Sequence, residues 1–252
     1  MSGPRPRETG AGSVSRRGAR DVLRESAREI VVVVLSILIA FALDAWWDEA
    51  VERGREEELL AALLAEFEAN RAPLELRIDN HERLGAGQDA VADLLDARGG
   101  SSVPVPDSLL ITLLITPTFD PTLGALEEAQ SSGLTSLIRN AELRRRLRGW
   151  RGRWQDVREE EQLNLRLVQD ELYPALARSV SLNALMGLGG PWMAGERTGA
   201  LRSGSIAVPA TPGLINFARQ RSIRSRRAAR ELTDLRAELD SIVALLGQEV
   251  GG

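Results

Sequence analysis

Cysteine and lysine do not occur in this sequence of 252 residues, and histidine occurs once, as His81. Without cysteine, disulfide bonds, thiolate zinc sites and cysteine nucleophiles are excluded. A single histidine removes most histidine-based catalysis and almost every transition-metal site. We therefore expect a protein that is not an enzyme, with no catalytic residue, no metal site and no cofactor.

The 32 basic residues are all arginines, which we interpret as the codon bias of a GC-rich bacterial genome and not as a binding signal. The formal net charge of -4 is unremarkable for a chain of this length. Electrostatic arguments must therefore rest on local segments of the chain.

The longest apolar run extends from Ile30 to Trp47 and has the length of a membrane span. Its eighteen residues correspond to roughly 27 Å of helix, against a hydrocarbon core of about 30 Å. The closing tryptophan pair suits the membrane interface, and Asp44 lies close enough to the end for its carboxylate to reach the headgroups. The positions expected to form the anchor and its interface are Ile30, Leu35, Leu38, Ala40, Leu43, Asp44, Trp46 and Trp47.

Charges on the two sides of this run differ and predict its orientation. Residues 1–29 carry seven arginines and four acids, whereas residues 44–58 carry seven acids and two arginines. The positive-inside rule then predicts a disordered cytoplasmic leader of residues 1–29 and an extracytoplasmic domain of residues 48–252. We expect a single-pass protein of the bacterial inner membrane.

A cleavable signal peptide is the alternative interpretation of the same run. Residues 40–42, Ala-Phe-Ala, form a small-x-small site after a basic leader and an apolar stretch. Cleavage after Ala42 would release the domain. A retained anchor is favoured because the apolar run continues past this site and because the segment before it is long for a signal peptide.

Apolar residues at spacings of three and four predict helices in most of the remaining chain. Pro73 is expected to kink or break the first long helix near residues 70–73, Asp107 to cap a short helix, and Gly133 to end another in a left-handed conformation. Asn140 is expected to begin a long helix that Pro174 stops. The predicted helices cover residues 48–85, 88–97, 108–115, 122–132, 140–173 and 213–249.

Residues 179–212 are rich in Gly, Ser and Pro and form the least regular part of the sequence. We expect an ordered cover over the helices, with a mobile loop that touches the membrane as the alternative. The predicted fold is therefore all-α, with one N-terminal transmembrane helix followed by an extracytoplasmic bundle of about three long helices with short helical inserts.

Charge is segregated along the predicted helices. Residues 139–153 hold seven arginines and one acid, and six further arginines lie between residues 219 and 230, whereas residues 44–98 hold fifteen acids and six arginines. We expect the basic faces to pack beside the acidic surface of residues 49–96 and so to set the order of the helices. Attraction to anionic lipid and binding of nucleic acid are the alternatives.

An acidic group near the histidine resembles a metal constellation. Glu75, Asp79 and Glu82 fall on one helical side close to His81. The sequence has no Glu-x-x-His pair there, and a two-metal bundle takes ligands from several helices. We therefore interpret this group as a solvated acidic face.

Two passages, SILIAFALDAWWDE and SSGLTSLIRNAELRRRL, together resemble a bacterial family of uncharacterised single-span membrane proteins. Asp44 departs from the family pattern, which has an amide near this place. The resemblance implies a retained anchor and lends no activity, because none is established for the family. The matching positions are residues 37–40, Trp46, Ser132, Gly133, Leu134, Leu137, Ile138, Asn140 and Leu143.

The sequence therefore favours a membrane-anchored helical interaction or scaffold protein of the bacterial envelope. Its expected partners are the lipid bilayer and either another protein or a second copy of the chain, without nucleic acid. One alternative is an extracytoplasmic sensor of a small ligand, with a pocket near Trp150, Trp154 and Trp192. The other is a cytoplasmic nucleic-acid binder with reversed topology.

Overall fold

The computed structural model describes residues 16–97, 101–182 and 204–251, with side chains from Val31 onward. Its residues are mostly helical, in agreement with the expected all-α class. The chain divides into two compact units, Met1–Arg55 and Glu56–Gly252.

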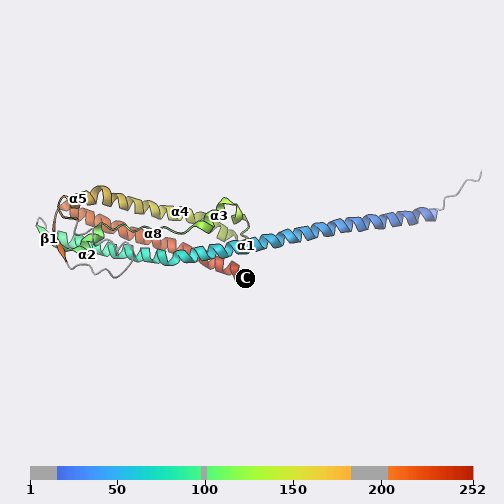
Figure 1. Cartoon of the computed structure of the whole chain (residues 1–252), viewed down its shortest axis with the longest axis horizontal. Helices are drawn as coiled ribbons and strands as arrows, with labels where there is room; N and C mark the ends of the chain where they lie inside the picture. The colour runs from blue at the N-terminus through green and yellow to red at the C-terminus, as the bar shows by residue number, and fades with distance from the viewer. Residues whose placement is uncertain (1–15, 98–100, 183–203, 252) are drawn as a thin grey trace, which may run out of the picture. The chain divides into compact units, whose positions relative to one another are not determined.

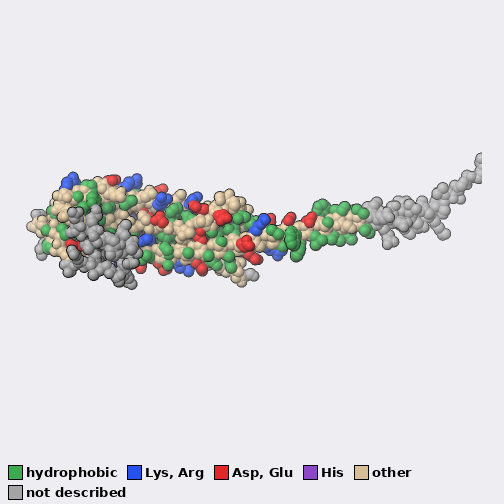
Figure 2. Space-filling view, in the orientation of Figure 1, with side chains coloured by type: hydrophobic (Ala, Val, Ile, Leu, Met, Phe, Trp, Pro, Cys, Tyr) green, Lys and Arg blue, Asp and Glu red, His purple; other side chains and the backbone are tan. Residues whose placement is uncertain are grey.

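Helix α1 (Arg16–Asp96) begins in the first unit. Within the described residues, this is one helix that is long and apolar enough to cross a membrane, with a mean hydropathy of 2.0 over the most apolar window. None of that window is buried by other parts of the chain. Figure 2 shows its apolar side chains as a green band around the helix, followed by the acidic side chains that come next in the sequence.

In the second unit, α1 turns one apolar stripe toward the interior. Leu60, Leu63, Phe67, Leu74 and Leu84 are all buried, at the helical spacing that the sequence predicts. Most charged side chains of α1 in this unit are exposed. Amphipathicity therefore places the helix, because only one of its faces gains from burial.

The expected break near residues 70–73, the alternative to a kink there, is wrong, and so is the expected separation of helices 48–85 and 88–97. Helix α1 is continuous and contains Pro73 in its interior. Proline removes one helical hydrogen bond and crowds the preceding turn. Pro73 itself is exposed, while Asn70 and Leu74 are buried, so tertiary contacts hold the helix before and after the proline.

Short elements connect α1 to the next long helix. Asp107 does not cap α2, because Pro106 holds the cap position and Asp107 is the first helical residue. Gly133 has a φ of 76° after the end of α3, so the predicted left-handed helix end is confirmed. In order, these elements are β1 (Ser102–Pro106), α2 (Asp107–Leu110), η1 (Ile111–Leu113), α3 (Gly124–Ser131) and η2 (Leu134–Ser136).

Helix α4 (Ala141–Arg166) begins as predicted. The side chain of Asn140 accepts hydrogen bonds from the backbone N–H groups of Glu142 and Leu143, each at 3.0 Å. The expected stop at residues 173–174 is wrong, because a π-helical segment η3 (Leu167–Leu172) leads directly into α5 (Tyr173–Ala177). Pro174 lies in the first turn of α5, directly after this π-helical segment.

Strand β2 (Ser205–Pro209) lies within the segment that the sequence indicates as irregular. It pairs antiparallel with β1, so that Val103 lies opposite Val208 and Val105 opposite Ile206. A strand pair was not predicted. The alternating burial along β1 shows that its valines fill the core while its other positions face solvent.

The last helix, α8 (Pro212–Val250), matches the predicted helix and is capped by the hydroxyl of Thr211. In the second unit, α1 and α4 run in the same direction and α8 runs in the opposite one (Figure 1). Two parallel helices cannot be joined by a tight turn. The chain must therefore travel back along the bundle between α1 and α4.

The apolar core is split into two clusters. The first contains buried residues of α1, α3, α4 and α8, among them Phe67 and Trp150, whose rings meet edge to face with centroids 5.2 Å apart. The second contains residues of the two strands, η1, η3, α5 and the beginning of α8, together with Leu84 and Leu95 of α1. Buried polar residues lie in the sequence between the two clusters on each long helix.

Candidate functional site

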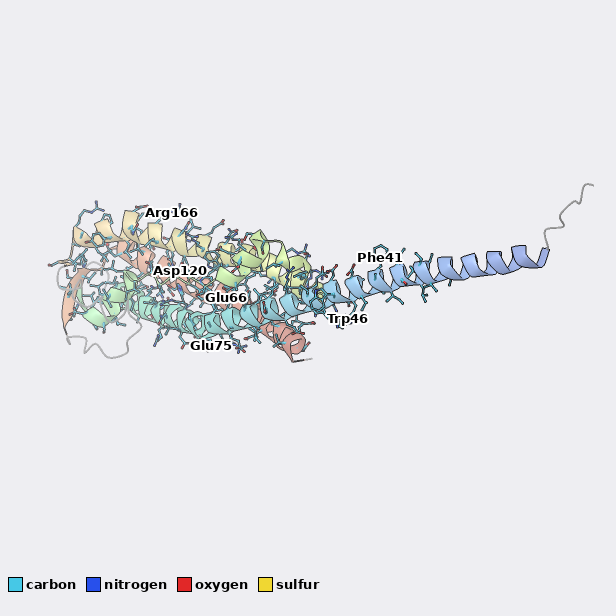
Figure 3. All side chains as sticks on the ribbon, turned by 45° about the vertical axis from the view of Figure 1, so that its right-hand side comes forward. Phe41, Trp46, Glu66, Glu75, Asp120 and Arg166 are labelled. Atoms are coloured by element: carbon cyan, nitrogen blue, oxygen red, sulfur yellow. The ribbon has the colours of Figure 1, made fainter. Side chains whose placement is uncertain are left out.

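The predicted anchor residues lie on the exposed part of α1. The side chains of Leu35, Leu38, Leu43, Trp46 and Trp47 are each more than half exposed. Ala40 and Asp44 are exposed as well, and the side chain of Ile30 lies outside the described residues. Figure 3 shows Phe41 and Trp46 standing out from the helix.

The second motif of the family resemblance forms the corner between α3 and α4. Ser132 and Gly133 end α3, Asn140 caps α4, and Ile138 and Leu143 are fully buried. The two remaining motif positions, Leu134 and Leu137, are half-buried in the same corner. The motif therefore specifies a turn between two packed helices and supplies no reactive group.

The acidic group around His81 does not form a metal site. No set of side chains suited to hold a metal ion occurs in residues 16–97, 101–182 and 204–251. Glu75, Asp79 and Glu82 are exposed, whereas His81 is buried, so that the acids and the imidazole lie on different faces of α1. Glu75 instead approaches Arg236 of α8, at 3.7 Å.

The two arginine clusters differ in their partners. From the cluster on α8, Arg219 contacts Asp89 and Asp93 of α1, and Arg226 contacts Asp89, in agreement with the predicted packing beside the acidic helix. In the cluster of residues 139–153, only Arg139 has a partner on α1 among the ion pairs described. The other ion pairs of this cluster lead to Glu127, Glu142 and Glu238.

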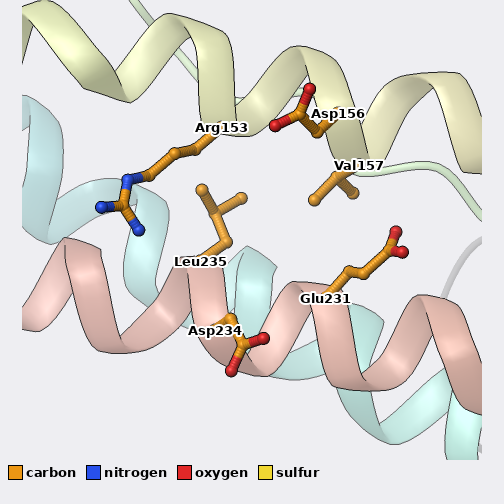
Figure 4. Close-up of a pocket in the computed structure, with 6 residues that line it drawn as sticks. All are labelled: Arg153, Asp156, Val157, Glu231, Asp234 and Leu235. Atoms are coloured by element: carbon orange, nitrogen blue, oxygen red, sulfur yellow. The ribbon is translucent and has the colours of Figure 1, made fainter.

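The pocket expected near the tryptophans is not found at Trp150, which is fully buried in the first apolar cluster. Trp192 lies outside the described residues. A shallow groove of about 180 Å³ does lie between α4 and α8, with Val157 and Leu235 at its base. Figure 4 shows this groove and its charged rim, made of Arg153, Asp156, Glu231 and Asp234.

The feature that sequence reasoning missed is an irregular segment, residues 111–126, which we call the crossover segment. It includes η1 and continues through residues without helix or strand to the first turn of α3. This segment packs against the long helices, and Leu113, Phe119 and Leu126 are fully buried. Backbone groups in such a place need hydrogen-bond partners, because water cannot reach them.

Helix α1 supplies partners at three places. The Asn70 side chain accepts from the N–H of Thr122 and donates to its carbonyl, both at 2.8 Å. The carboxylate of Glu66, labelled in Figure 3, accepts the N–H groups of Ala125 and Leu126 in the first turn of α3. A negative charge is favourable at this end of a helix. The buried amide of Gln88 donates to the carbonyl of Thr112 at 2.7 Å.

Helix α4 supplies partners for Phe119. The buried carboxyl of Glu161 accepts the N–H of Phe119 at 3.0 Å, and the indole N–H of Trp154 donates to the Phe119 carbonyl at 3.1 Å. Burial raises the pKa of Glu161 from 4.5 to about 8, and the nearby charge of Asp120 acts in the same direction. The carboxyl is therefore mostly protonated at neutral pH.

Helix α8 supplies Arg221, which is fully buried. Its guanidinium donates to the carbonyls of Leu113 at 3.1 Å and Ile115 at 2.7 Å, and to the side-chain oxygen of Asn164. No carboxylate pairs with it within the part of the chain that the structure describes. Burial lowers the pKa of Arg221 to about 10, and the charge of Arg224 adds to this effect.

His81 belongs to the same buried region. It is 1% exposed, and neither imidazole nitrogen makes a hydrogen bond of ordinary length and angle, although the carbonyl of Pro117 is close enough to act on the ring. Burial lowers the pKa of His81 from 6.5 to about 4, and the charges of Arg221 and Arg77 lower it further, while the Pro117 carbonyl has the opposite effect. The ring is therefore neutral at physiological pH.

One sequence signal pointed to this region, because Glu161 interrupts an otherwise regular apolar stripe on α4. The buried polar side chains can hold the crossover segment and can exchange protons, and they present no nucleophile or metal-ligand set. No family model, curated protein or solved structure matches the chain.

Proposed function

We propose that this chain is a single-pass membrane protein that presents a helical domain for interaction with another protein. The observation that carries the membrane part is the exposed apolar run of α1. All of its large apolar side chains from Val31 to Leu43 are about half exposed or more, although they surround the whole helix. A soluble helix turns such residues toward a core, whereas lipid accepts them on every side.

The polar residues of this run also suit a lipid environment. The hydroxyl of Ser36 donates to the carbonyl of Val32 at 2.8 Å, so that no side-chain donor is left for the hydrocarbon. Asp44 and the tryptophan pair come at the end of the run, where headgroups and water begin. These features support a retained anchor over a cleaved signal peptide.

We further propose that the N-terminus is cytoplasmic and that residues 48–252 lie outside the cytoplasm, at the inner membrane of a bacterium. The arginine-rich leader and the acids that follow the run support this orientation. Because the chain has no cysteine, single-cysteine variants give a clean test. A membrane-impermeant maleimide applied to spheroplasts should label Gln162→Cys and should leave Ser13→Cys unlabelled until the cells are lysed.

The opposite labelling pattern would contradict the proposed orientation. Extraction of membranes with alkaline carbonate tests the anchor separately, because an integral protein stays in the pellet. A version of the protein with a tag at each end also reports cleavage, because cleavage separates the two tags. If the two tags separate at a site near Ala42, the domain is released and the anchor proposal fails.

The interaction role is supported by the exposed faces of α4 and α8, which carry many charges of both signs (Figure 2). We also propose that the chain belongs to the family of single-span proteins that the two motifs resemble, which accords with the anchor. Chemical cross-linking in intact membranes, followed by purification through the tag, tests the interaction role. A purified protein that hydrolyses a substrate or binds a metal stoichiometrically would overturn the interaction role.

A further inference from the structure

His81 occupies a place where a second positive charge would be costly. The ring is buried, and neither of its nitrogens makes a hydrogen bond of ordinary length and angle. A buried histidine usually makes a hydrogen bond with at least one ring nitrogen, because burial removes the hydrogen bonds that water would otherwise provide. The place of this ring in the bundle therefore has consequences when it gains a proton.

Positive charges face the ring from two helices. Arg221 of α8 and Arg77 of α1 both disfavour a proton on His81. From the crossover segment the ring meets the carbonyl of Pro117, which favours the proton and is outweighed by burial. A protonated ring would therefore repel the guanidinium that holds two carbonyls of the crossover segment.

Helix α4 does not supply a compensating negative charge. Arg77 also interacts with Glu161, but this carboxyl is protonated at the acidic pH at which His81 titrates. The other buried acid of this region, Glu160, is already paired with Arg224 at 3.0 Å. The exposed Asp120 of the crossover segment and Arg158 of α4 act on Glu161 with opposite signs.

We propose that His81 is an acid-sensitive switch for the crossover segment: a protonated imidazole repels Arg221, and residues 111–119 then detach from the core. The device needs no ligand, because the repelling charge is created inside the bundle. It is also independent of the membrane anchor, since every group involved belongs to the second unit.

The direction of the pH effect follows from the two protonation states. The pKa of His81 is about 4 in the folded protein and 6.5 when the ring is exposed. An open state binds a proton more readily than the closed state between these values. The closed state is therefore fully favoured above pH 6.5 and loses stability as the pH falls toward 4.

The first measurement is an NMR titration of the full chain in detergent micelles. Because His81 is the only histidine, its imidazole gives one signal without ambiguity. We expect an apparent pKa well below the ordinary value of 6.5. Substitution Arg77→Met should raise this apparent pKa, whereas Arg230→Met, an exposed arginine further along α8, should leave it unchanged.

The second measurement reports the crossover segment itself. Ile115→Cys places a buried thiol in the segment, and Ala129→Cys places one in α3, which belongs to the first apolar cluster. A disulfide reagent that reacts in acid should modify the first thiol at least tenfold faster near pH 4 than at neutral pH, after correction for its intrinsic reactivity. The second thiol should stay protected.

Neutral replacements of the ring complete the test. Both His81→Gln and His81→Met should remove the acid-dependent exposure of residue 115, and either variant suffices if the other does not fold. Equal exposure of both cysteines in acid would mean general unfolding, and acid exposure that persists in both variants would mean that another group is responsible. Each result would overturn the proposal, as would an apparent pKa of 6.5 or above for His81.

Discussion

The side chain of Asn70 and the backbone of Thr122 form a reciprocal pair of hydrogen bonds, each 2.8 Å long. An amide side chain offers the same donor and acceptor as a neighbouring strand would offer. Asn70 therefore makes the hydrogen bonds to Thr122 that a neighbouring strand would make if this part of the chain belonged to a sheet. Similar contacts from Glu66 and Glu161 continue this arrangement along the crossover segment.

Replacement of Asn70 by alanine should destabilise the protein by about 2 to 4 kcal/mol, because it leaves a donor and an acceptor of Thr122 without partners. The control is Glu68→Ala, an exposed position of the same helix, for which we expect a change within about 0.5 kcal/mol. Urea unfolding of the full chain in micelles, followed by tryptophan fluorescence, measures both. Equal effects of the two substitutions would show that the Asn70 contacts add nothing.

Arg221→Met should be more damaging, by about 3 to 5 kcal/mol, because three acceptors lose a buried charged donor at once. Methionine keeps much of the volume, so the loss reports hydrogen bonds more than packing. The matched control is Arg230→Met, an exposed residue of the same helix. If Arg221→Met is as stable as the control, the guanidinium is not what holds the crossover segment.

The sequence predicted the long helices because their apolar residues recur at a helical period, which reports burial directly. It also predicted the cap at Asn140 and the left-handed Gly133, since both depend on neighbours in the chain. Pro73 and Pro174 misled the prediction. Local rules for proline ignore tertiary contacts, and these contacts keep α1 continuous and carry the helix into α5.

The crossover segment and its polar partners could not be predicted in the same way. Asn70 and Thr122 are 52 residues apart, and Arg221 and Leu113 are 108 apart. No periodic pattern records such distant pairs. In the sequence alone, polar residues such as Gln88 and Asn164 look like surface positions. They are buried, because α1 and α4 run in the same direction and the chain must return along the bundle between these two helices.

Gly87 is required for the close approach of α1 to the crossover segment. A Cβ atom built there would lie 2.8 Å from the Cγ2 atom of Thr112, which is buried and β-branched and cannot move away easily. Gly87→Ala should therefore destabilise the protein by about 1 to 3 kcal/mol, despite the better helix propensity of alanine.

Gly152 provides the matched comparison, because a Cβ atom there would meet nothing within 4 Å. Gly152→Ala on α4 should stabilise the protein by about 0.5 to 1 kcal/mol, through helix propensity alone. Thermal unfolding of both variants under one set of conditions gives the comparison. Opposite signs are expected, and stabilisation by both substitutions would contradict the close contact at Gly87.

Glu161 should make the protein less stable as the pH rises. Its pKa is about 8 when folded and 4.5 when the carboxyl is exposed, because burial disfavours the charged form. Between these values the unfolded chain loses its proton first, so stability falls across this range and levels off above pH 8. The loss is a few kcal/mol, at most roughly 5 for a shift of this size.

Glu161→Gln should remove this fall, because a neutral amide has no proton to lose and its oxygen can still accept the N–H of Phe119. The variant should be more stable than the natural protein above pH 8 and close to it near pH 4.5. Urea unfolding at a series of pH values measures the difference, with the exposed neighbour Glu159→Gln as control. A difference that does not grow with pH would mean that Glu161 is ionised in the folded protein, and that the N–H of Phe119 and nearby arginines offset its burial.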